Sequence, residues 1–163
     1  MNAVQLATTL LKMSSATTLA YISDFSDADL LVRPLPGANH AAWQMGHLIL
    51  AERFIVSELP GVAYPDLPQG FAEAHGKDRA QVADTTGWCT RAEYESLFHA
   101  TREATLAALG KLADSGLDQA TQNRLKEKAP TVGALLALLS QHDAMHGGQF
   151  TAIRRALSKP VLF

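Results

Sequence analysis

The sequence predicts an all-α protein, a single four-helix bundle that takes up residues 1–163. Four long stretches repeat apolar residues at steps of three and four, which is helical spacing, and none sustains the alternation of a strand. Such alternating steps are typical of helices that pack nearly parallel in a bundle. A chain of 163 residues, 47% of them hydrophobic, is long enough to bury one proper core. No repeat, low-complexity tract or linker divides it into further domains.

The first helix is expected over about residues 3–24. Its buried face is predicted to hold Leu6, Leu10, Met13, Thr17 and Tyr21. Lys12 interrupts the apolar N-terminal stretch and no small-residue cleavage site follows, so an amphipathic helix is favoured over a signal peptide. No stretch reaches the ~18 uninterrupted apolar residues of a membrane span. We therefore expect a cytoplasmic protein without a membrane partner.

The second helix is expected to begin after the sequence RPLPGAN, with Asn39 as its N-cap, and to end before Pro60. One of its faces carries Trp43, His47, Leu50 and Phe54. Residues 59–89 then form a long connection, which predicts a crossover rather than a hairpin between the second and third helices. Its aromatic residues either cover the open end of a site or form a packing belt, and both readings stay open: Tyr64, Phe71 and Trp88.

The third helix is expected to start at a capping box, Thr90-Arg91-Ala92-Glu93, and to run to about Leu112. The fourth helix follows Pro130-Thr131 and continues to about Leu157. Its inner face is predicted to hold Val132, Leu135, Leu139, His142, His146, Gln149 or Phe150, and Ile153.

Composition excludes several classes of function. A net charge of −2 provides no basic surface for nucleic acid. Cys89 is the single cysteine, which excludes an internal disulfide and suits a reducing compartment. The sequence contains neither a phosphate-binding glycine loop nor the E-x-x-H motif of carboxylate-bridged di-iron bundles. Cys89 shares no helix face with a histidine and an acid, so a cysteine nucleophile is not expected.

A metal site is predicted from three histidines. His142 and His146 are four residues apart and in phase with the leucines of the last helix, so both rings should point into the bundle. His47 has the same phase on the second helix. Burying three unpartnered imidazoles is costly, whereas one divalent ion bound by all three removes that cost. The alternative is three separate core histidines, each hydrogen-bonded to a hydroxyl or carbonyl group.

The remaining candidates are expected to lie outside this site. His40 is predicted to be exposed or packed near the bundle end, His75 to be a solvated loop residue and His99 to be on the surface. Asp143 is expected to be a solvated acid, although it could orient a histidine ligand without itself binding the metal. Gln149 could reach a ligand of the metal or make an ordinary hydrogen bond inside the bundle. Gly147 and Gly148 are expected to let a neighbouring helix, subunit or ligand approach closely.

The sequences RPLPGANHAAWQMGHL and HDAMHGGQF resemble the DinB/YfiT-like superfamily of metalloenzymes. The resemblance covers nearly the whole chain and implies an up-down-down-up four-helix bundle that forms a homodimer. It also implies a divalent metal, nickel or zinc, held by His47, His142 and His146. His40 and Gly147 depart from the usual pattern, which makes inference of a substrate from relatives less safe.

Three histidine ligands leave a coordination position open, as in catalytic rather than structural sites. The resemblance implies a metal-dependent S-transferase or detoxification enzyme that acts on a small-molecule substrate with a low-molecular-weight thiol such as bacillithiol or mycothiol. A metal-dependent hydrolase is the alternative enzyme, and a non-catalytic metal-binding stress-response protein is the alternative outside catalysis. The sequence identifies no general base beside the histidines.

Overall fold

The computed structural model describes residues 1–82 and 87–162, and it confirms the all-helical prediction. Four helices are long: α1 (Ala3–Ile22), α2 (Ala41–Ile55), α4 (Arg91–Leu109) and α5 (Val132–Ala156). Four are short: η1 (Asp29–Leu31), α3 (Phe71–Ala74), η2 (Lys77–Arg79) and η3 (Asp114–Asp118). The described residues form no β-strand and only one isolated bridge, between Ala120 and Thr131.

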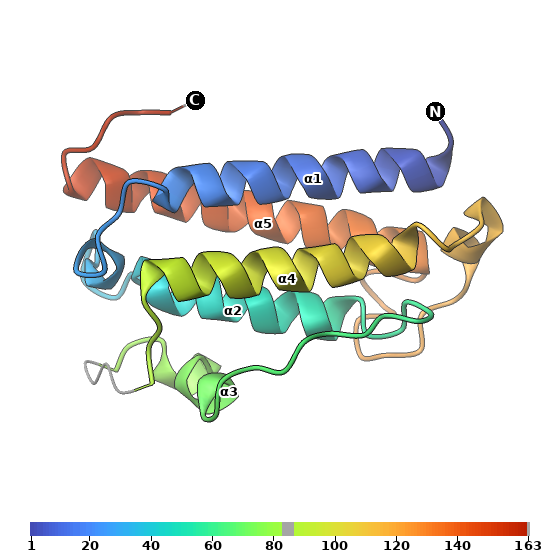
Figure 1. The fold of residues 1–163 in the computed structure, drawn as a ribbon, viewed down its shortest axis with the longest axis horizontal. Helices are drawn as coiled ribbons and strands as arrows, with labels where there is room; N and C mark the ends of the chain where they lie inside the picture. Colours follow the sequence, from blue (N-terminus) through green and yellow to red (C-terminus); the bar gives the residue numbers. More distant parts are fainter. Residues whose placement is uncertain (83–86, 163) are drawn as a thin grey trace.

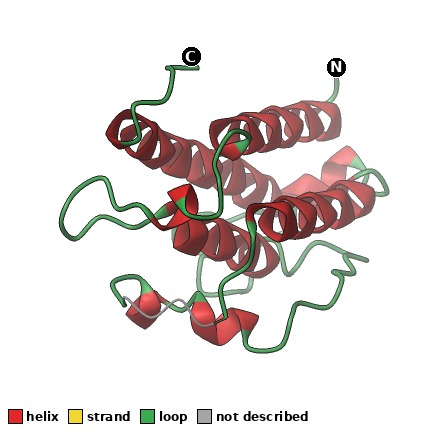
Figure 2. Cartoon of the chain, turned by 60° about the vertical axis from the view of Figure 1, so that its left-hand side comes forward, coloured by secondary structure: helices red, strands yellow, loops and turns green. Residues whose placement is uncertain are grey.

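The four long helices lie side by side along the molecule (Figure 1). Helices α1 and α5 run in one direction, and α2 and α4 run in the other. Helix α5 packs against both α1 and α2, while α4 packs against the other sides of the same two helices. The short helices of the connection between α2 and α4 lie to one side of this group (Figure 2). The seam between α2 and α5 is where the predicted histidines meet.

Side-chain caps start the long helices. Thr90 and Glu93 form the predicted capping box of α4, and Asn2 and Gln5 form a further one at α1. The predicted Asn39 cap of α2 is wrong, because His40 is the N-cap and its Nδ1 accepts a hydrogen bond from the Trp43 N–H at 3.2 Å. The His40 ring is packed rather than exposed, with only 4% of its surface accessible. A neutral imidazole nitrogen can accept this hydrogen bond as a carboxylate or amide oxygen does.

The predicted inner face of α1 is wrong at Leu6, Leu10 and Met13, whereas Tyr21 packs against the core as predicted. Leu6 is 49% exposed and Met13 is 62% exposed, and Leu10 lies on the same outer face. The residues that face the core are offset by one position and include small polar side chains: Leu11, Ser15, Thr18 and Ile22. Lys12 is the one charged residue in α1, so apolar periodicity alone did not distinguish the two faces.

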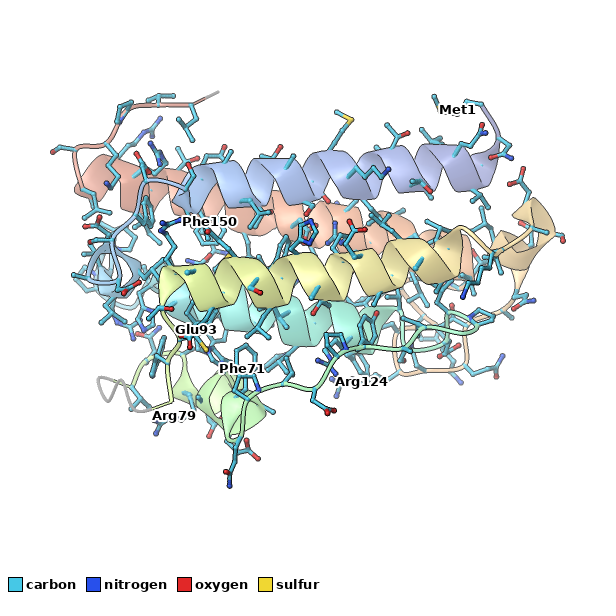
Figure 3. The ribbon with its side chains drawn as sticks, in the orientation of Figure 1. Met1, Phe71, Arg79, Glu93, Arg124 and Phe150 are labelled. Atoms are coloured by element: carbon cyan, nitrogen blue, oxygen red, sulfur yellow. The ribbon has the colours of Figure 1, made fainter. Side chains whose placement is uncertain are left out.

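The aromatic residues of the 59–89 connection pack against the bundle. Phe71 is 1% exposed in the core, between α3 and the long helices (Figure 3). The Tyr64 hydroxyl shares a hydrogen bond of 3.0 Å with Thr105 Oγ1. Trp88 packs against the same core cluster as Phe71. The packing-belt reading is therefore favoured for these three residues, while positions 83–86 of the predicted connection lie outside the described residues.

None of the helices in the described part of the chain combines the length and the apolar character that crossing a membrane would require.

Candidate metal centre

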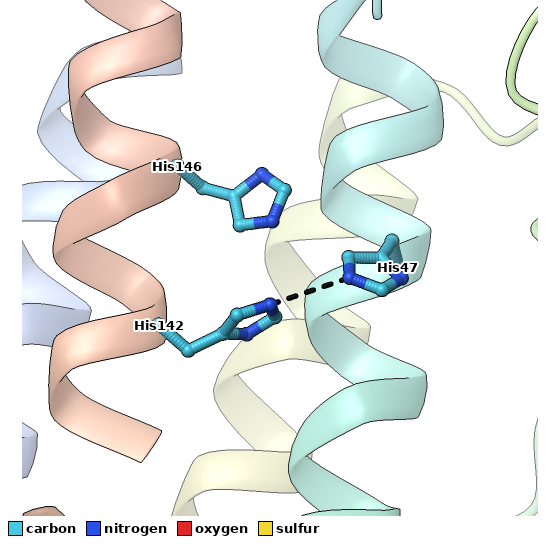
Figure 4. A group of neighbouring side chains, drawn as sticks. All are labelled: His47, His142 and His146. Carbon is cyan, nitrogen blue, oxygen red and sulfur yellow. Dashed lines mark hydrogen bonds between the residues drawn. The ribbon is translucent and has the colours of Figure 1, made fainter. Parts of the chain in front are cut away.

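The structure brings His47, His142 and His146 together at the seam between α2 and α5 (Figure 4). One ring nitrogen from each lies within 4.8 Å of the others. The Nε2 atoms of His47 and His142 are 3.3 Å apart. The ring centroid of His146 is 5.2 Å from that of His47 and 4.8 Å from that of His142. These are the three residues that the phase of the two helices predicted to converge.

Neighbouring side chains fix the orientation of the rings. The His47 ring stacks on the Trp43 ring, one turn earlier in α2, with centroids 4.8 Å apart and an angle of 7°. His146 Nδ1 lies 2.9 Å from Gln44 Oε1, so the neutral ring donates from Nδ1 and keeps a lone pair on Nε2. Sequence reasoning missed Gln44 and considered Gln149 instead, but Gln149 is exposed. Gln44 lies three residues before His47, a spacing that places both on adjacent turns of one helix face.

All three imidazoles are neutral at physiological pH. Burial, followed by the neighbouring His142, lowers the pKa of His47 to about 4. Burial, followed by His142 and His47, lowers the pKa of His146 to about 3. Burial also lowers the pKa of His142. Neutral imidazole is the form that binds a metal ion, so no proton has to be displaced at pH 7.

The residues present fit a divalent metal ion. Two facing Nε2 atoms at 3.3 Å cannot both present lone pairs to each other without a proton or a cation between them. His142 Nδ1 is also buried without a hydrogen-bond partner among the described residues. Three neutral nitrogen donors suit zinc or nickel and leave a position for a further ligand. No acidic group of residues 1–82 and 87–162 belongs to this cluster of possible ligands.

A pocket of about 660 Å³ opens onto two of these histidines. That volume lies within the range of small-molecule sites. Its lining combines apolar side chains of α2 and α5 with residues from two connections: His47, Leu50, Ala51, Phe54, Ile55, His75, Gly76, Lys77, Arg124, Leu125, Lys128, Leu138 and His142. A molecule that enters this pocket therefore reaches His47 and His142 directly.

The prediction that His75 is solvated is wrong. Its ring is 1% exposed, with Nδ1 2.7 Å from the Phe71 carbonyl oxygen and Nε2 2.6 Å from the Tyr94 hydroxyl. The ring lies directly on α2 at Gly46, where an added Cβ would come within 1.9 Å of His75 Cδ2. Gly46 thus allows a loop histidine to close over the helix that carries His47.

The prediction that Asp143 is a solvated acid is also wrong, since Asp143 is 1% exposed. Arg102 of α4 donates to its Oδ2 at 2.8 Å and to both carboxylate oxygens of Glu52, at 2.9 Å and 3.0 Å. The Ser14 hydroxyl donates to the same Oδ2 at 2.7 Å. Sequence reasoning missed Glu52 and Arg102. Their positions on faces otherwise filled by apolar residues, beside Ile49 and Phe98, were the available signal.

The other candidates lie away from the centre. His99 is exposed, as predicted. An added Cβ at Gly147 would lie 3.2 Å from Tyr21 Cε2, so of the three expected kinds of neighbour it is a helix, α1, that approaches this glycine closely. Gly148 has open space around it and permits no such approach.

Comparison with known proteins agrees with the helical fold. A crystal structure of a conserved protein from Enterococcus faecalis is similar to this chain, with a TM-score of 0.69 and 17% sequence identity. The similarity covers 98% of this chain and 99% of that one. At this identity the likeness shows the fold alone. No curated protein matches the chain.

The family described as the DinB superfamily matches residues 10–150, which include all three converging histidines and the helices that carry them. The match covers most of the 163 residues, so the chain belongs to the DinB superfamily.

Proposed function

We propose that His47, His142 and His146 bind one divalent metal ion, nickel or zinc, in an enzyme that transfers a low-molecular-weight thiol to a small electrophile. The observation that carries the proposal is the pocket of about 660 Å³ that opens onto His47 and His142. When bound, such an ion supplies a Lewis acid that lowers the pKa of a thiol or water beside it. The thiol is of the bacillithiol or mycothiol type.

The histidines, Gln44 and the apolar lining of the pocket have separate parts in this proposal. The three imidazoles provide neutral donors, and Gln44 holds His146 in one tautomer. The apolar side chains of α2 and α5 that line the pocket can hold the apolar part of a substrate. In the transfer, the thiol proton leaves to solvent and the sulfur forms a bond to carbon. The bond to the leaving group breaks, and that group departs with the electron pair.

Thiol transfer is favoured over metal-dependent hydrolysis by the lining of the pocket. Hydrolysis calls for a general base beside the attacking water, and no carboxylate in the described part of the chain lines this pocket. His75 lines it, but both of its ring nitrogens are already hydrogen-bonded. A thiol with a lowered pKa needs no further base.

A non-catalytic metal-binding stress-response protein is the competing proposal. The accessible pocket argues against it, because an ion that only holds helices together needs no 660 Å³ space beside it. The bundle also has two buried apolar clusters that account for its folding without a metal.

Metal analysis of protein purified without a histidine tag tests the site. One equivalent of nickel or zinc is expected in the natural chain, with loss of the metal in His47→Ala and His146→Ala. His99→Ala, on an exposed histidine, is the matched control and should retain the metal. Full occupancy in both site variants would refute the ligand assignment.

Cobalt substitution tests whether the site is open and reactive. Addition of a small thiol to the cobalt protein should change its visible spectrum, and an electrophile should then be consumed together with the thiol. No spectral change with thiol, azide or cyanide would favour the stress-response alternative. Consumption of an ester or amide without thiol would favour the hydrolase.

The proposal includes an up-down-down-up bundle in a cytoplasmic homodimer. The opposite directions of the α1/α5 and α2/α4 pairs support the bundle. The single cysteine suits a reducing compartment. Leu6, Leu10 and Met13 form an exposed apolar face on α1, and Lys12 is the one charge on that helix, so a symmetric contact would bury few charges. Met13→Glu should shift a dimer toward monomer in light scattering, whereas Leu35→Glu, at an exposed residue outside α1, should not.

A further inference from the structure

The charged side chains that line the pocket beside the histidines are all positive among the described residues. Lys77, Arg124 and Lys128 line it, and no aspartate or glutamate among residues 1–82 and 87–162 does. The chain as a whole has two more acidic than basic residues, so this local excess of positive charge is not a consequence of overall composition. Lys77 comes from the connection between α2 and α4, and Arg124, labelled in Figure 3, comes with Lys128 from the connection between α4 and α5. A cleft lined by one sign of charge concentrates ligands of the opposite sign.

The backbone that carries these cations is anchored to α2 and to the turn that follows it. The Trp43 indole N–H donates to the Gly76 carbonyl oxygen at 2.9 Å, which fixes the residue before Lys77. On the other connection, Glu58 accepts hydrogen bonds from the backbone N–H groups of Gln122, at 2.7 Å, and Asn123. The Glu58 carboxylate is thereby engaged with the turn that carries Arg124, and it does not form an ion pair with the guanidinium.

The three cations are free to bind a ligand. Among residues 1–82 and 87–162, no carboxylate forms an ion pair with any of them. The Arg124 guanidinium lies over the Phe54 ring, 4.2 Å from its centroid, an arrangement that holds the plane in place and leaves its N–H groups available.

We propose that this pocket selects a small molecule that carries an anionic group, carboxylate or phosphate, on an apolar stem. The anionic oxygens pair with Arg124, Lys128 and Lys77, and the stem lies on Leu50, Phe54 and Leu138. Arginine matches both kinds of anion through its planar fork of donors. This inference rests on the proposed function only in assigning the reacting end of the molecule to the side of His47 and His142.

Titration of the metal-free protein with hexanoate, hexyl phosphate and hexanamide tests the proposal by calorimetry or amide chemical shifts. At least one of the two anions should bind, and whichever binds more tightly identifies the anionic group. Hexanamide should bind about tenfold more weakly or not at all, since it lacks the charge. Binding should also weaken as salt is raised, because the Debye length is only about 10 Å at 0.1 M salt.

Arg124→Gln and Lys128→Gln should each weaken binding of the anion about tenfold. Lys126→Gln is the matched control, because Lys126 is exposed on the same turn but does not line the pocket. Equal binding of hexanamide, or equal loss in the Lys126 variant, would overturn the proposal. So would anion binding that requires the metal and survives both pocket substitutions, since the anion would then bind the ion itself.

The outcomes separate this inference from the proposed function. Anion binding to the metal-free protein, with no thiol transfer by the metal-loaded protein, would remove the proposed function and leave the binding site. Thiol transfer to neutral electrophiles, with no effect of Arg124→Gln on anion binding, would leave the enzyme and remove the selectivity proposed here.

Discussion

Arg102 of α4 donates a hydrogen bond of 2.8 Å to Asp143, the residue that follows His142 in α5. Both side chains are almost completely buried, at 2% and 1% exposure. The same guanidinium binds Glu52 of α2 and donates to the Leu11 carbonyl oxygen of α1, so one arginine links all four long helices, two of which carry the candidate ligands. A buried charged cluster therefore connects the two helices that carry the candidate ligands, and its members Glu52, Arg102 and Asp143 are not among the residues that line the pocket.

Removal of Arg102 should strongly destabilise the fold. Arg102→Met leaves Glu52 and Asp143 as buried carboxylates without a counter-charge, which costs about 3–5 kcal/mol. The free energy of unfolding in urea measures this loss. Arg91→Met is the control, because Arg91 forms a partly exposed ion pair with Glu95. Ion pairs of this kind contribute less than about 1 kcal/mol to the free energy of unfolding. Similar small losses in the two variants would show that the buried cluster does not carry the expected energy.

Gln44 should set the affinity of the site for metal without being a ligand. Gln44→Leu removes the acceptor of the His146 Nδ1 hydrogen bond, so the ring loses its fixed tautomer, and metal affinity should fall about 10–100-fold. Chelator competition measures this affinity, and the thermal unfolding of the metal-free variant checks that the fold is intact. Gln149→Leu, at an exposed position in α5, should bind metal as the natural chain does. An unchanged affinity for Gln44→Leu would mean that packing alone orients His146.

How far the sequence predicted this molecule depended on whether a feature is local. The capping box at Thr90 and the phase of His142 and His146 are properties of single helices. A local motif was sufficient to predict the first, and apolar periodicity was sufficient to predict the second. The burial of Asp143 depends on a partner 41 residues away on another helix, which no local pattern encodes. The prediction of the inner face of α1 failed for a related reason. Only the packing of the other helices decides which of two nearly uncharged faces becomes buried.

Two histidines show the same limit, His40 because its capping role was missed and His75 because it was expected to be solvated. His40 was not recognised as a cap, because its acceptor nitrogen is available only when burial keeps the ring neutral. The buried position of the His75 ring depends on the absence of a side chain at Gly46, a residue that lies on another helix and far away in the sequence. The glycine in the sequence MGHL was the one visible signal, and a helix-interior glycine beside a candidate ligand indicates a close approach.

His40 should make the stability of the metal-free protein dependent on acid pH. Burial, followed by the charges of Arg33 and His75, lowers its pKa to about 4 from an ordinary value of 6.5. Between these values the unfolded chain binds a proton that the folded chain does not, so stability present above pH 6.5 is lost as pH falls toward 4. The slope contributed by this group is about 1.4 kcal/mol per pH unit at most.

His40→Asn is the variant that isolates this effect. Asparagine retains a side-chain acceptor for the cap of α2 but does not titrate, so the free energy of unfolding should depend less steeply on pH between 6.5 and 4. His47 and His146 are present in both proteins, and their contributions cancel in the difference. Urea unfolding at several pH values, with metal removed, gives both slopes. Parallel curves would mean that His40 is already neutral or charged to the same degree in the folded and unfolded chains.

Alanine at two glycines of the long helices should have opposite effects. At Gly46 the new Cβ would come within 1.9 Å of the His75 ring, so the ring must leave its place against α2, at a cost of about 1–3 kcal/mol. At Gly148 nothing lies within 4 Å, and alanine should stabilise α5 by about 0.5–1 kcal/mol. Chemical denaturation measures both changes. Because His75 also lines the pocket, Gly46→Ala should alter binding of hexanoate while Gly148→Ala leaves it unchanged. Stabilisation by both alanines would show that the His75 ring can move away from α2 without a loss of folding free energy. The contact between His75 and Gly46 would then not contribute to stability.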